Sequence, residues 1–197
     1  WLREVYSQGK GCIMVTGHFG AVEFLPLALS VNGFRVAMIV RYKTHHLKEA
    51  CEVIGNERDA ILIVANEIGV LQAALSAIKD GRILITQCDE FKHWNICRNK
   101  QTVVFGVSIP RDRTLDVLYN RTRVPSCLGL MMRLERGYQL FIAPIANGYE
   151  NNDLSESSWQ ALENFILKFP EQWYEWKAVS TYIPLLKLKR QGNSDAD

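Results

Sequence analysis

The sequence lacks several features that would place the protein in a particular class. It has no run of about 18 apolar residues, the length that a membrane-spanning helix needs. No secretory signal peptide is visible. The five cysteines are odd in number and show no Cys-x-x-Cys spacing, so we expect no disulfide framework and infer a reducing compartment. A net charge of +2 over 197 residues is too small to indicate nucleic-acid binding.

Two common hydrolase motifs are also absent. The chain contains no Gly-x-Ser-x-Gly, the turn that presents the nucleophile of many serine hydrolases. It contains no His-Glu-x-x-His, the zinc-binding motif of many metallopeptidases. His93 and Cys97 are close in sequence, but no second pair of ligands accompanies them. We therefore expect neither a metal site nor a resident cofactor.

The composition is that of an ordinary globular protein, with 48% hydrophobic and 22% charged residues. A chain of this length can bury a sizeable core within one domain. We expect a single domain over residues 1–190, followed by a polar tail over 191–197. Because the chain begins with Trp1 rather than Met, we interpret it as part of a longer chain.

Apolar segments alternate with helical patterns over the first 88 residues. A strand is expected where apolar residues run continuously between glycines, as in GCIMVTG (11–17). A helix is expected where apolar residues recur at helical spacing, as in 67–81. Apolar strands separated by helices predict an α/β fold with a mostly parallel central sheet and helices on both faces. The expected strands are 11–17, 34–41, 60–65 and 82–88, and the expected helices are 21–33, 45–55 and 67–81.

Pro26 lies beyond the first turn of the expected helix 21–33, so we predict a kink or a late start there. The rest of the chain is expected to hold a polar loop at 89–101 and a helix at 114–123. Two strands, 124–134 and 138–145, are expected around a turn at 135–137. A helix is expected over 153–169, with Ser155 or Ser157 as its cap. Its apolar face indicates packing in the core.

The segment VTGHFGAVEF (15–24) carries the candidate site. His18 directly follows a buried strand, at the sheet edge where α/β proteins collect their sites. Glu23 lies in the next helix, and helical side chains lean toward the helix N-terminus. We therefore hypothesise that Glu23 orients His18, which acts as a general base. Gly17 and Gly20 allow a tight turn and leave room for a substrate, and the backbone N–H groups at the helix start are candidates for binding an oxyanion.

A base without a protein nucleophile beside it suggests that the substrate supplies its own nucleophile, such as a hydroxyl group. A purely structural interpretation is also open at this point. In that interpretation His18 stands at a strand end and only hydrogen-bonds a nearby acid.

Several segments of the chain together resemble one known protein family. The segment His18–Glu23 has the spacing His-x-x-x-x-Glu, which resembles the signature of the late (HtrB-like) acyltransferases of bacterial lipid A biosynthesis, within the wider glycerolipid acyltransferase group. Arg41 ends the second strand, as an arginine does in that family. Further segments resemble the family in the same order along the chain, namely AALSAIKDGRILITQCDE (73–90), VVFGVSIP (103–110) and FPEQWYEWK (169–177).

The resemblance implies a glycerolipid acyltransferase-like fold and an O-acyltransferase activity. A fatty acyl group would pass from acyl carrier protein, or from coenzyme A, to a hydroxyl of a lipid A-type glycolipid. His18 would be the base and Glu23 its orienting residue. Arg41, Asp89 and Gly20 would bind substrate, with Arg41 on a phosphate or the oxyanion and Asp89 orienting Arg41 or the acceptor. No metal is implied.

The resemblance also implies partners and a location. The expected partners are acyl carrier protein, a lipid or glycolipid acceptor and the membrane surface, at the cytoplasmic face of the inner membrane. The family's N-terminal membrane helix is not found in this sequence. An acidic carrier protein needs a basic landing surface. The candidates are Arg41, Lys43, Lys48, Arg111, Arg113, Arg121 and Arg123.

Three alternatives stay open. The first is acyl transfer to another lipid, such as a lysophospholipid or an ornithine lipid. It is suggested by Ala21-Val22, where the family has Asn-Trp, and by Cys88-Asp89-Glu90, where it has Asp-Gln. The second is a lipid-binding relative without activity. The third is a structural α/β domain.

Overall fold

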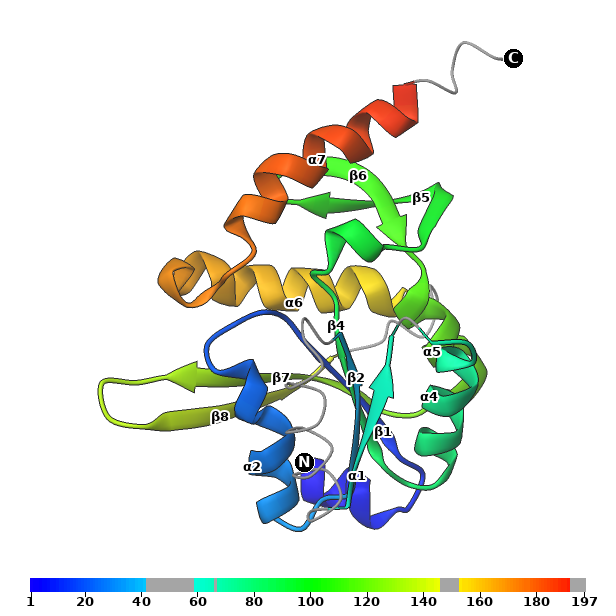
Figure 1. Cartoon of the computed structure of the whole chain (residues 1–197), viewed down its shortest axis with the longest axis vertical. Helices are drawn as coiled ribbons and strands as arrows, with labels where there is room; N and C mark the ends of the chain where they lie inside the picture. Colours follow the sequence, from blue (N-terminus) through cyan, green and yellow to red (C-terminus); the bar gives the residue numbers. More distant parts are fainter. Residues whose placement is uncertain (42–58, 66, 146–152, 192–197) are drawn as a thin grey trace.

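A six-stranded sheet forms the centre of the protein (Figure 1). The computed structural model describes residues 1–41, 59–65, 67–145 and 153–191. The strand order is β3-β2-β4-β1-β7-β8; all pairs are parallel except β7 with β8. The strands are β1 (Cys12–Thr16), β2 (Val36–Val40), β3 (Ala60–Val64), β4 (Ile83–Gln87), β7 (Ser126–Arg133) and β8 (Tyr138–Pro144).

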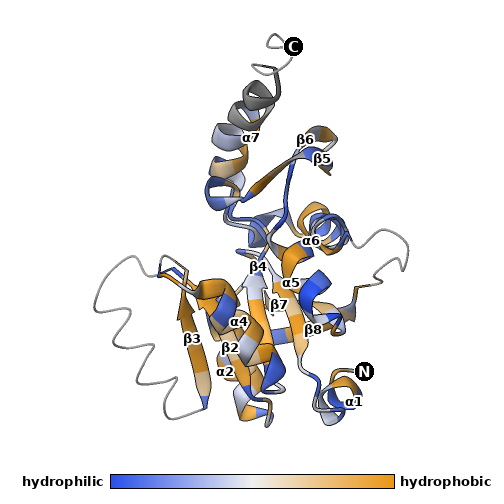
Figure 2. Ribbon diagram, turned by 90° about the vertical axis from the view of Figure 1, so that its right-hand side faces the viewer, coloured by the Kyte–Doolittle hydropathy of each residue, from blue (hydrophilic) through white to orange (hydrophobic). Residues whose placement is uncertain are grey.

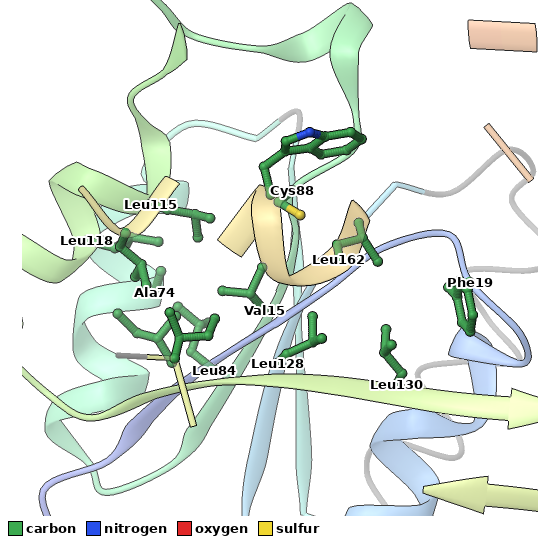
Figure 3. Packing of buried hydrophobic residues seen from close by; sticks show 14 of the residues in the cluster. Val15, Phe19, Ala74, Leu84, Cys88, Leu115, Leu118, Leu128, Leu130 and Leu162 are labelled. Atoms are coloured by element: carbon green, nitrogen blue, oxygen red, sulfur yellow. The ribbon is translucent and has the colours of Figure 1, made fainter. Parts of the chain in front are cut away.

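Helices cover both faces of this sheet, so the predicted α/β fold with a mostly parallel sheet is confirmed. Ile13 and Val15 belong to a core cluster that includes side chains of α4, α5 and α6. Cys12 and Met14 point the other way, into a cluster with α1 and α2. Figure 3 shows Val15 of the first cluster among leucines of neighbouring elements. The helices are α1 (Leu2–Ser7), α2 (Leu25–Val31), α4 (Val70–Lys79), α5 (Thr114–Thr122) and α6 (Leu154–Lys168).

The central strands are apolar throughout because both of their faces are covered. All five residues of β1 are buried. Full burial of an aliphatic side chain contributes about 1.5–3 kcal/mol, so this strand anchors the fold. Figure 2 shows hydrophobic colour along β2 and β3. The turn that follows β1 is therefore held at a fixed place on the edge of the sheet.

The helix predicted over 21–33 starts late, as Pro26 indicates. A 3₁₀ turn, η1 (Val22–Phe24), precedes α2, and Pro26 lies in the first turn of α2. A proline is tolerated there because the N–H groups of the first turn have no intrahelical partner. The strands predicted at 34–41, 60–65, 82–88, 124–134 and 138–145 and the helices at 67–81 and 114–123 are confirmed within a few residues at their ends.

The polar loop predicted over 89–101 is wrong. The chain forms a 3₁₀ turn, η2 (Phe91–His93), and then β5 (Ile96–Val104), which pairs with β6 (Val107–Asp112) in a separate antiparallel sheet. The first half of β5 is too polar to show strand periodicity. Its pairing with β6 supplies the backbone hydrogen bonds that the sequence pattern does not reveal.

The helix predicted over 153–169 is confirmed as α6, but its predicted caps are wrong. Ser155 and Ser157 lie inside the helix, and the residue at the N-cap is Asp153. The Asp153 carboxylate accepts hydrogen bonds from Lys100 at 2.7 Å and pairs with Arg111 at 2.9 Å, which ties α6 to the small sheet. The predicted core face is confirmed, since Trp159 and Leu162 are buried.

The chain ends with two elements that the sequence analysis does not predict. A 3₁₀ turn, η3 (Pro170–Gln172), leads into α7 (Trp176–Gln191). Helix α7 contacts β6 and η2 above the carboxyl ends of the parallel strands (Figure 1). It continues into the tail predicted to be polar, and residues 192–197 lie outside the described residues, as does the helix predicted at 45–55. None of the helices in the described ranges is long and apolar enough to cross a membrane.

Candidate functional site

His18 lies in the turn between β1 and η1, at the carboxyl end of the central strand. Its partner is Asp89, which follows β4, the parallel neighbour of β1. The Nδ1 atom of His18 is 3.0 Å from Oδ1 of Asp89, and the backbone N–H of His18 donates to Oδ2 at 2.7 Å. Asp89 is fully buried, whereas the His18 side chain is 28% exposed. The carboxylate therefore holds the imidazole from the protein side and leaves its other edge toward solvent.

The electrostatic surroundings favour the protonated form of His18. Burial is the largest single influence and lowers the pKa of His18, while the hydrogen bond and charge of Asp89 raise it. The charges of Glu175 and Glu90 act in the same direction, so the pKa is raised above the usual 6.5. Glu175 Oε1 lies 3.9 Å from Nδ1. A histidine with a raised pKa and a fixed ring is suited to accept a proton during a reaction.

The segment 172–175 lies alongside the turn that carries His18. The backbone N–H of Gly20 donates to Gln172 at 2.7 Å, and that of Tyr174 donates to the His18 carbonyl at 3.0 Å. Trp173 forms an isolated antiparallel bridge with Phe19. The Trp173 indole also donates to Oδ2 of Asp89 at 2.8 Å. The C-terminal part of the chain thus completes the site.

The predicted pairing of Glu23 with His18 is not what the structure shows. Glu23 Oε1 lies 3.2 Å from Nη2 of Arg133, at the end of β7, and both side chains are about half exposed. The orienting position is taken by Asp89. The reason is that residues 22–24 form a 3₁₀ turn rather than the first turn of an α-helix, which changes the direction of the Glu23 side chain.

Arg41 and Asp89 do not form the predicted pair either. Arg41 Nε donates to Oε2 of Glu90 at 2.8 Å, while both oxygens of Asp89 face His18 and one of them also accepts from Trp173. Two successive residues after β4 therefore have different partners. Asp89 points inward to His18, and Glu90 points toward the end of β2 and binds Arg41. Arg41 remains beside the site, with 26% of its side chain exposed.

Gly20 has a structural role in the observed turn, and its predicted contact with substrate stays a prediction. Its φ of +62° lies in the left-handed region, and a Cβ added there would collide with the carbonyl oxygen of Met131. A Cβ on Gly17 would lie 2.6 Å from Leu162 and 2.8 Å from the Asp89 carboxylate. Both glycines let the turn pack closely on β7 and on Asp89.

Four backbone N–H groups in the turn before η1 are already engaged within the protein. Those of His18, Phe19, Gly20 and Ala21 each donate to an oxygen of the protein. The oxyanion site expected at the helix start concerns the N–H groups that follow this turn and stays a prediction, and the guanidinium of Arg41 is a second candidate beside His18.

A cavity of about 700 Å³ opens beside His18. This volume lies within the range of small-molecule sites, about 300–1,000 Å³. One part of its wall is apolar and consists of residues of η1, α2, β2 and β3, and the other part is polar. The described residues that line it are His18, Val22, Glu23, Pro26, Met38, Val40, Arg41, Leu62, Gln87, Glu90, Phe91, Lys92, His93, Glu175, Ala178 and Tyr182.

The structure describes only part of the basic surface proposed for a carrier protein. Arg111 is 8% exposed and pairs with Asp153, so it is unavailable to a partner. Arg123 lies over the ring of Tyr119. Lys43 and Lys48 lie outside the described residues. Within the described ranges, no group of three or more His, Cys, Asp or Glu side chains is placed to hold a metal ion.

Sequence reasoning missed Trp173 and Glu175, and it assigned Asp89 to the wrong partner. Asp89 and Trp173 are 71 and 155 residues from His18, so no local spacing connects them. The only signal was the resemblance of 73–90 and 169–177 to family segments, which marks both regions without giving their contacts.

Comparison of the sequence with known protein families finds no match, and comparison with curated proteins finds none either. The likeness to the acyltransferases therefore depends on the short segments quoted above.

Proposed function

We propose that this protein is an O-acyltransferase that moves a fatty acyl group from a carrier thioester to a hydroxyl group of a lipid, with His18 as general base. The observation that carries the proposal is the pairing of His18 with the buried carboxylate of Asp89 on the wall of the cavity. The proposed fold family is the glycerolipid acyltransferases, on the basis of the parallel sheet and the His-x-x-x-x-Glu segment.

The geometry supports the following sequence of proton and bond changes. With the Nδ1–H donated to Asp89, the Nε2 lone pair takes the proton of the acceptor hydroxyl. The oxygen forms a bond to the thioester carbonyl carbon, and the carbon–sulfur bond breaks. The imidazolium then returns its proton to the departing thiolate. A thiol with a pKa of about 8.5 is a good leaving group, so one histidine serves both steps.

The composition of the cavity wall supports a nucleophile supplied by the substrate. The described lining residues include no serine, threonine or cysteine beside His18. A covalent acyl-enzyme of the usual serine, threonine or cysteine type needs such a residue within hydrogen-bond reach of the base. Direct attack by an acceptor hydroxyl needs only the base, the donor and a pocket that holds both.

The apolar part of the cavity supports a fatty acyl substrate. Val22 and Pro26 face it from the α2 side, and Met38 and Leu62 face it from the sheet. Burial of acyl chain against such a wall contributes about 0.8 kcal/mol per methylene group. The polar part carries Glu23, Glu90 and Glu175 together with Arg41 and Lys92. Carboxylates accept hydrogen bonds from hydroxyl groups, which suits a sugar head group.

The acceptor proposed is a lipid A-type glycolipid, from the family resemblance. The alternative acceptor is another lipid, such as a lysophospholipid or an ornithine lipid, because Ala21-Val22 and Cys88-Asp89-Glu90 depart from the family pattern at the site. The proposed donor is acyl carrier protein or coenzyme A, and the proposed location is the cytoplasmic face of the inner membrane.

An exposed apolar patch beside the cavity supports contact with a membrane surface. The rings of Phe24 and Tyr138 contact each other at a tilt with their centroids 5.2 Å apart, and each side chain is more than 40% exposed. Leu134, at the tip of the β7–β8 hairpin, is 50% exposed. Figure 1 shows this hairpin extending away from the body of the protein. Aromatic and aliphatic side chains at a projecting tip are suited to the membrane interface.

The experiment that tests the proposal compares the protein with its His18→Gln variant in a bacterial host. Lipid A and total phospholipids are extracted and weighed by mass spectrometry. We expect an acyl-sized mass gain on one lipid class with the wild-type protein. Loss of the base lowers the rate by about 10²–10⁴-fold, so the variant gives almost none of this product.

The matched control is Asp80→Asn, an exposed site at the opposite, amino-terminal end of β4. A mass gain on a lipid other than lipid A supports acyl transfer and identifies the alternative acceptor. Equal gains with wild type and His18→Gln contradict the base role. No gain on any lipid with folded wild-type protein contradicts the enzyme assignment and favours a lipid-binding relative.

A further inference from the structure

The indole of Trp173 hydrogen-bonds the carboxylate of Asp89, which in turn hydrogen-bonds His18. Its N–H donates to Oδ2 of Asp89 at 2.8 Å, and Trp173 is 2% exposed. An indole N–H is a donor only and does not titrate. This hydrogen bond therefore persists over the whole range in which His18 changes its charge.

The two carboxylate oxygens of Asp89 have different hydrogen-bond partners. Oδ2 accepts from the backbone N–H of His18 and from Trp173, while Oδ1 faces Nδ1 of His18 at 3.0 Å. Two donors on Oδ2 prevent rotation of the carboxylate, so Oδ1 stays in line with the ring. They also draw negative charge toward Oδ2, which weakens the pull of Oδ1 on the Nδ1 proton.

Trp173 is itself rigidly placed. Hydrogen bonds of Gly20 to Gln172 and of Tyr174 to His18 flank it on the backbone. Its ring contacts Phe105 and Trp176 at centroid distances of 5.6 and 4.9 Å. Such packing leaves the indole no alternative rotamer without a large cavity.

We propose that Trp173 is a positioning residue that sets the base strength of His18 through Asp89. Trp173 is not among the described residues that line the cavity, and its ring contacts one of them, Phe91, at a centroid distance of 6.5 Å. The catalytic consequence rests on the proposed function. The physical core of the proposal, the coupling of the indole to the His18 proton, is measurable without any substrate.

The other charged groups that act on His18 remain in place when Trp173 is changed. They are Glu175, which precedes α7, and Glu90, which follows β4 and pairs with Arg41 just after β2. A change in the titration of His18 on substitution of Trp173 alone therefore reports on Asp89.

The experiment is an NMR titration of His18 in the full chain, assigned with His18→Gln. Trp173→Phe keeps an aromatic ring and removes the donor. The charge on Asp89 then shifts toward Oδ1, the imidazolium is held more tightly, and the pKa of His18 rises by about 0.5–1 pH unit. The matched control is Trp176→Phe, which removes an indole donor to Pro170 in the same aromatic cluster and leaves the His18 titration unchanged.

A second NMR measurement uses only the wild-type protein, so it does not depend on the folding of a variant. In the wild-type protein, the indole N–H signal of Trp173 shifts with the same midpoint as His18, whereas that of Trp176 does not. The proposal is overturned if the His18 pKa in Trp173→Phe is unchanged or lowered. It is also overturned if the Trp173 indole signal does not shift at the midpoint of the His18 titration.

Activity provides an independent readout. In Trp173→Phe the acid limb of kcat/KM moves upward with the His18 pKa, so the loss is about 3- to 10-fold below that limb and disappears above it. A loss that is equal at every pH indicates a structural role and overturns the proposal. Because the titrations use no substrate, they stand even if acyl transfer is not found.

Discussion

Nδ1 of His18 lies 3.0 Å from Oδ1 of Asp89, although 71 residues separate the two along the chain. The pairing arises because β1 and β4 are parallel neighbours, with Thr16 beside Gln87 at their carboxyl ends. Each strand places its next polar side chain at the same edge of the sheet. A partly exposed imidazole thereby meets a fully buried carboxylate.

Asp89→Asn is expected to move the acid limb of activity to lower pH. His18 acts in its neutral form, so activity falls as the pH falls through its pKa. Asp89, together with Glu175 and Glu90, raises that pKa above 6.5 in the wild-type protein, which places the limb above 6.5. Without this carboxylate, burial, which lowers the pKa, is opposed only by Glu175 and Glu90. The measurement is kcat/KM between pH 5 and 9.

The maximal rate of Asp89→Asn is also expected to fall, by about 10²-fold or more, because the imidazole loses the group that fixes its tautomer. Asp80→Asn serves as the control and keeps the wild-type profile. If the limb of Asp89→Asn stays in place, Asp89 does not control the proton affinity of His18.

Gly20→Ala is expected to destabilise the protein more than Gly33→Ala. Both glycines have positive φ, which costs an alanine about 1–2 kcal/mol. At Gly33 the added Cβ meets nothing within 4 Å, whereas at Gly20 it collides with the backbone of β7. We expect a further loss of about 1–3 kcal/mol at Gly20 from this collision. Chemical denaturation measures both, and equal losses contradict the close packing of the turn.

Leu62→Trp is expected to shorten the acyl chains that the protein accepts. Leu62 lines the apolar part of the cavity, and a larger side chain there fills space next to Met38. We expect kcat/KM for long-chain donors to fall by about tenfold or more, with short-chain donors much less affected. Ile61→Trp is the matched control, because Ile61 is the next residue of β3 and is 40% exposed away from the cavity wall. An equal effect on all chain lengths places the acyl chain elsewhere.

Removal of the exposed patch is expected to weaken binding to lipid vesicles. We expect the triple variant Phe24→Ala, Leu134→Ala and Tyr138→Ala to bind vesicles of phosphatidylethanolamine and phosphatidylglycerol about tenfold or more weakly in co-sedimentation. The control replaces three apolar residues exposed elsewhere, Val31, Ile68 and Leu167, with alanine. Equal binding by the two triple variants contradicts a specific membrane-facing patch.

Strong local signals made most of the sheet predictable from the sequence. The strands β1 and β4 are continuous apolar runs, a pattern that only burial on both faces explains, and Pro26 set the late start of α2. The strand β5 was not predictable in the same way. Its polar residues form a strand because they pair with β6, and the composition of a single segment does not indicate which other segment it will pair with.

The sequence by itself determined that a histidine would stand at the carboxyl end of a buried strand, because hydrophobic burial fixes the strand and the strand fixes the turn after it. Only the tertiary structure decided which acid would hold that histidine. Glu23, five residues away, turns to Arg133, and Asp89 takes its place with Trp173 behind it. The physical reason is that strand order and the return of the C-terminal segment bring distant side chains within 3 Å, whereas a 3₁₀ turn directs a nearby one elsewhere.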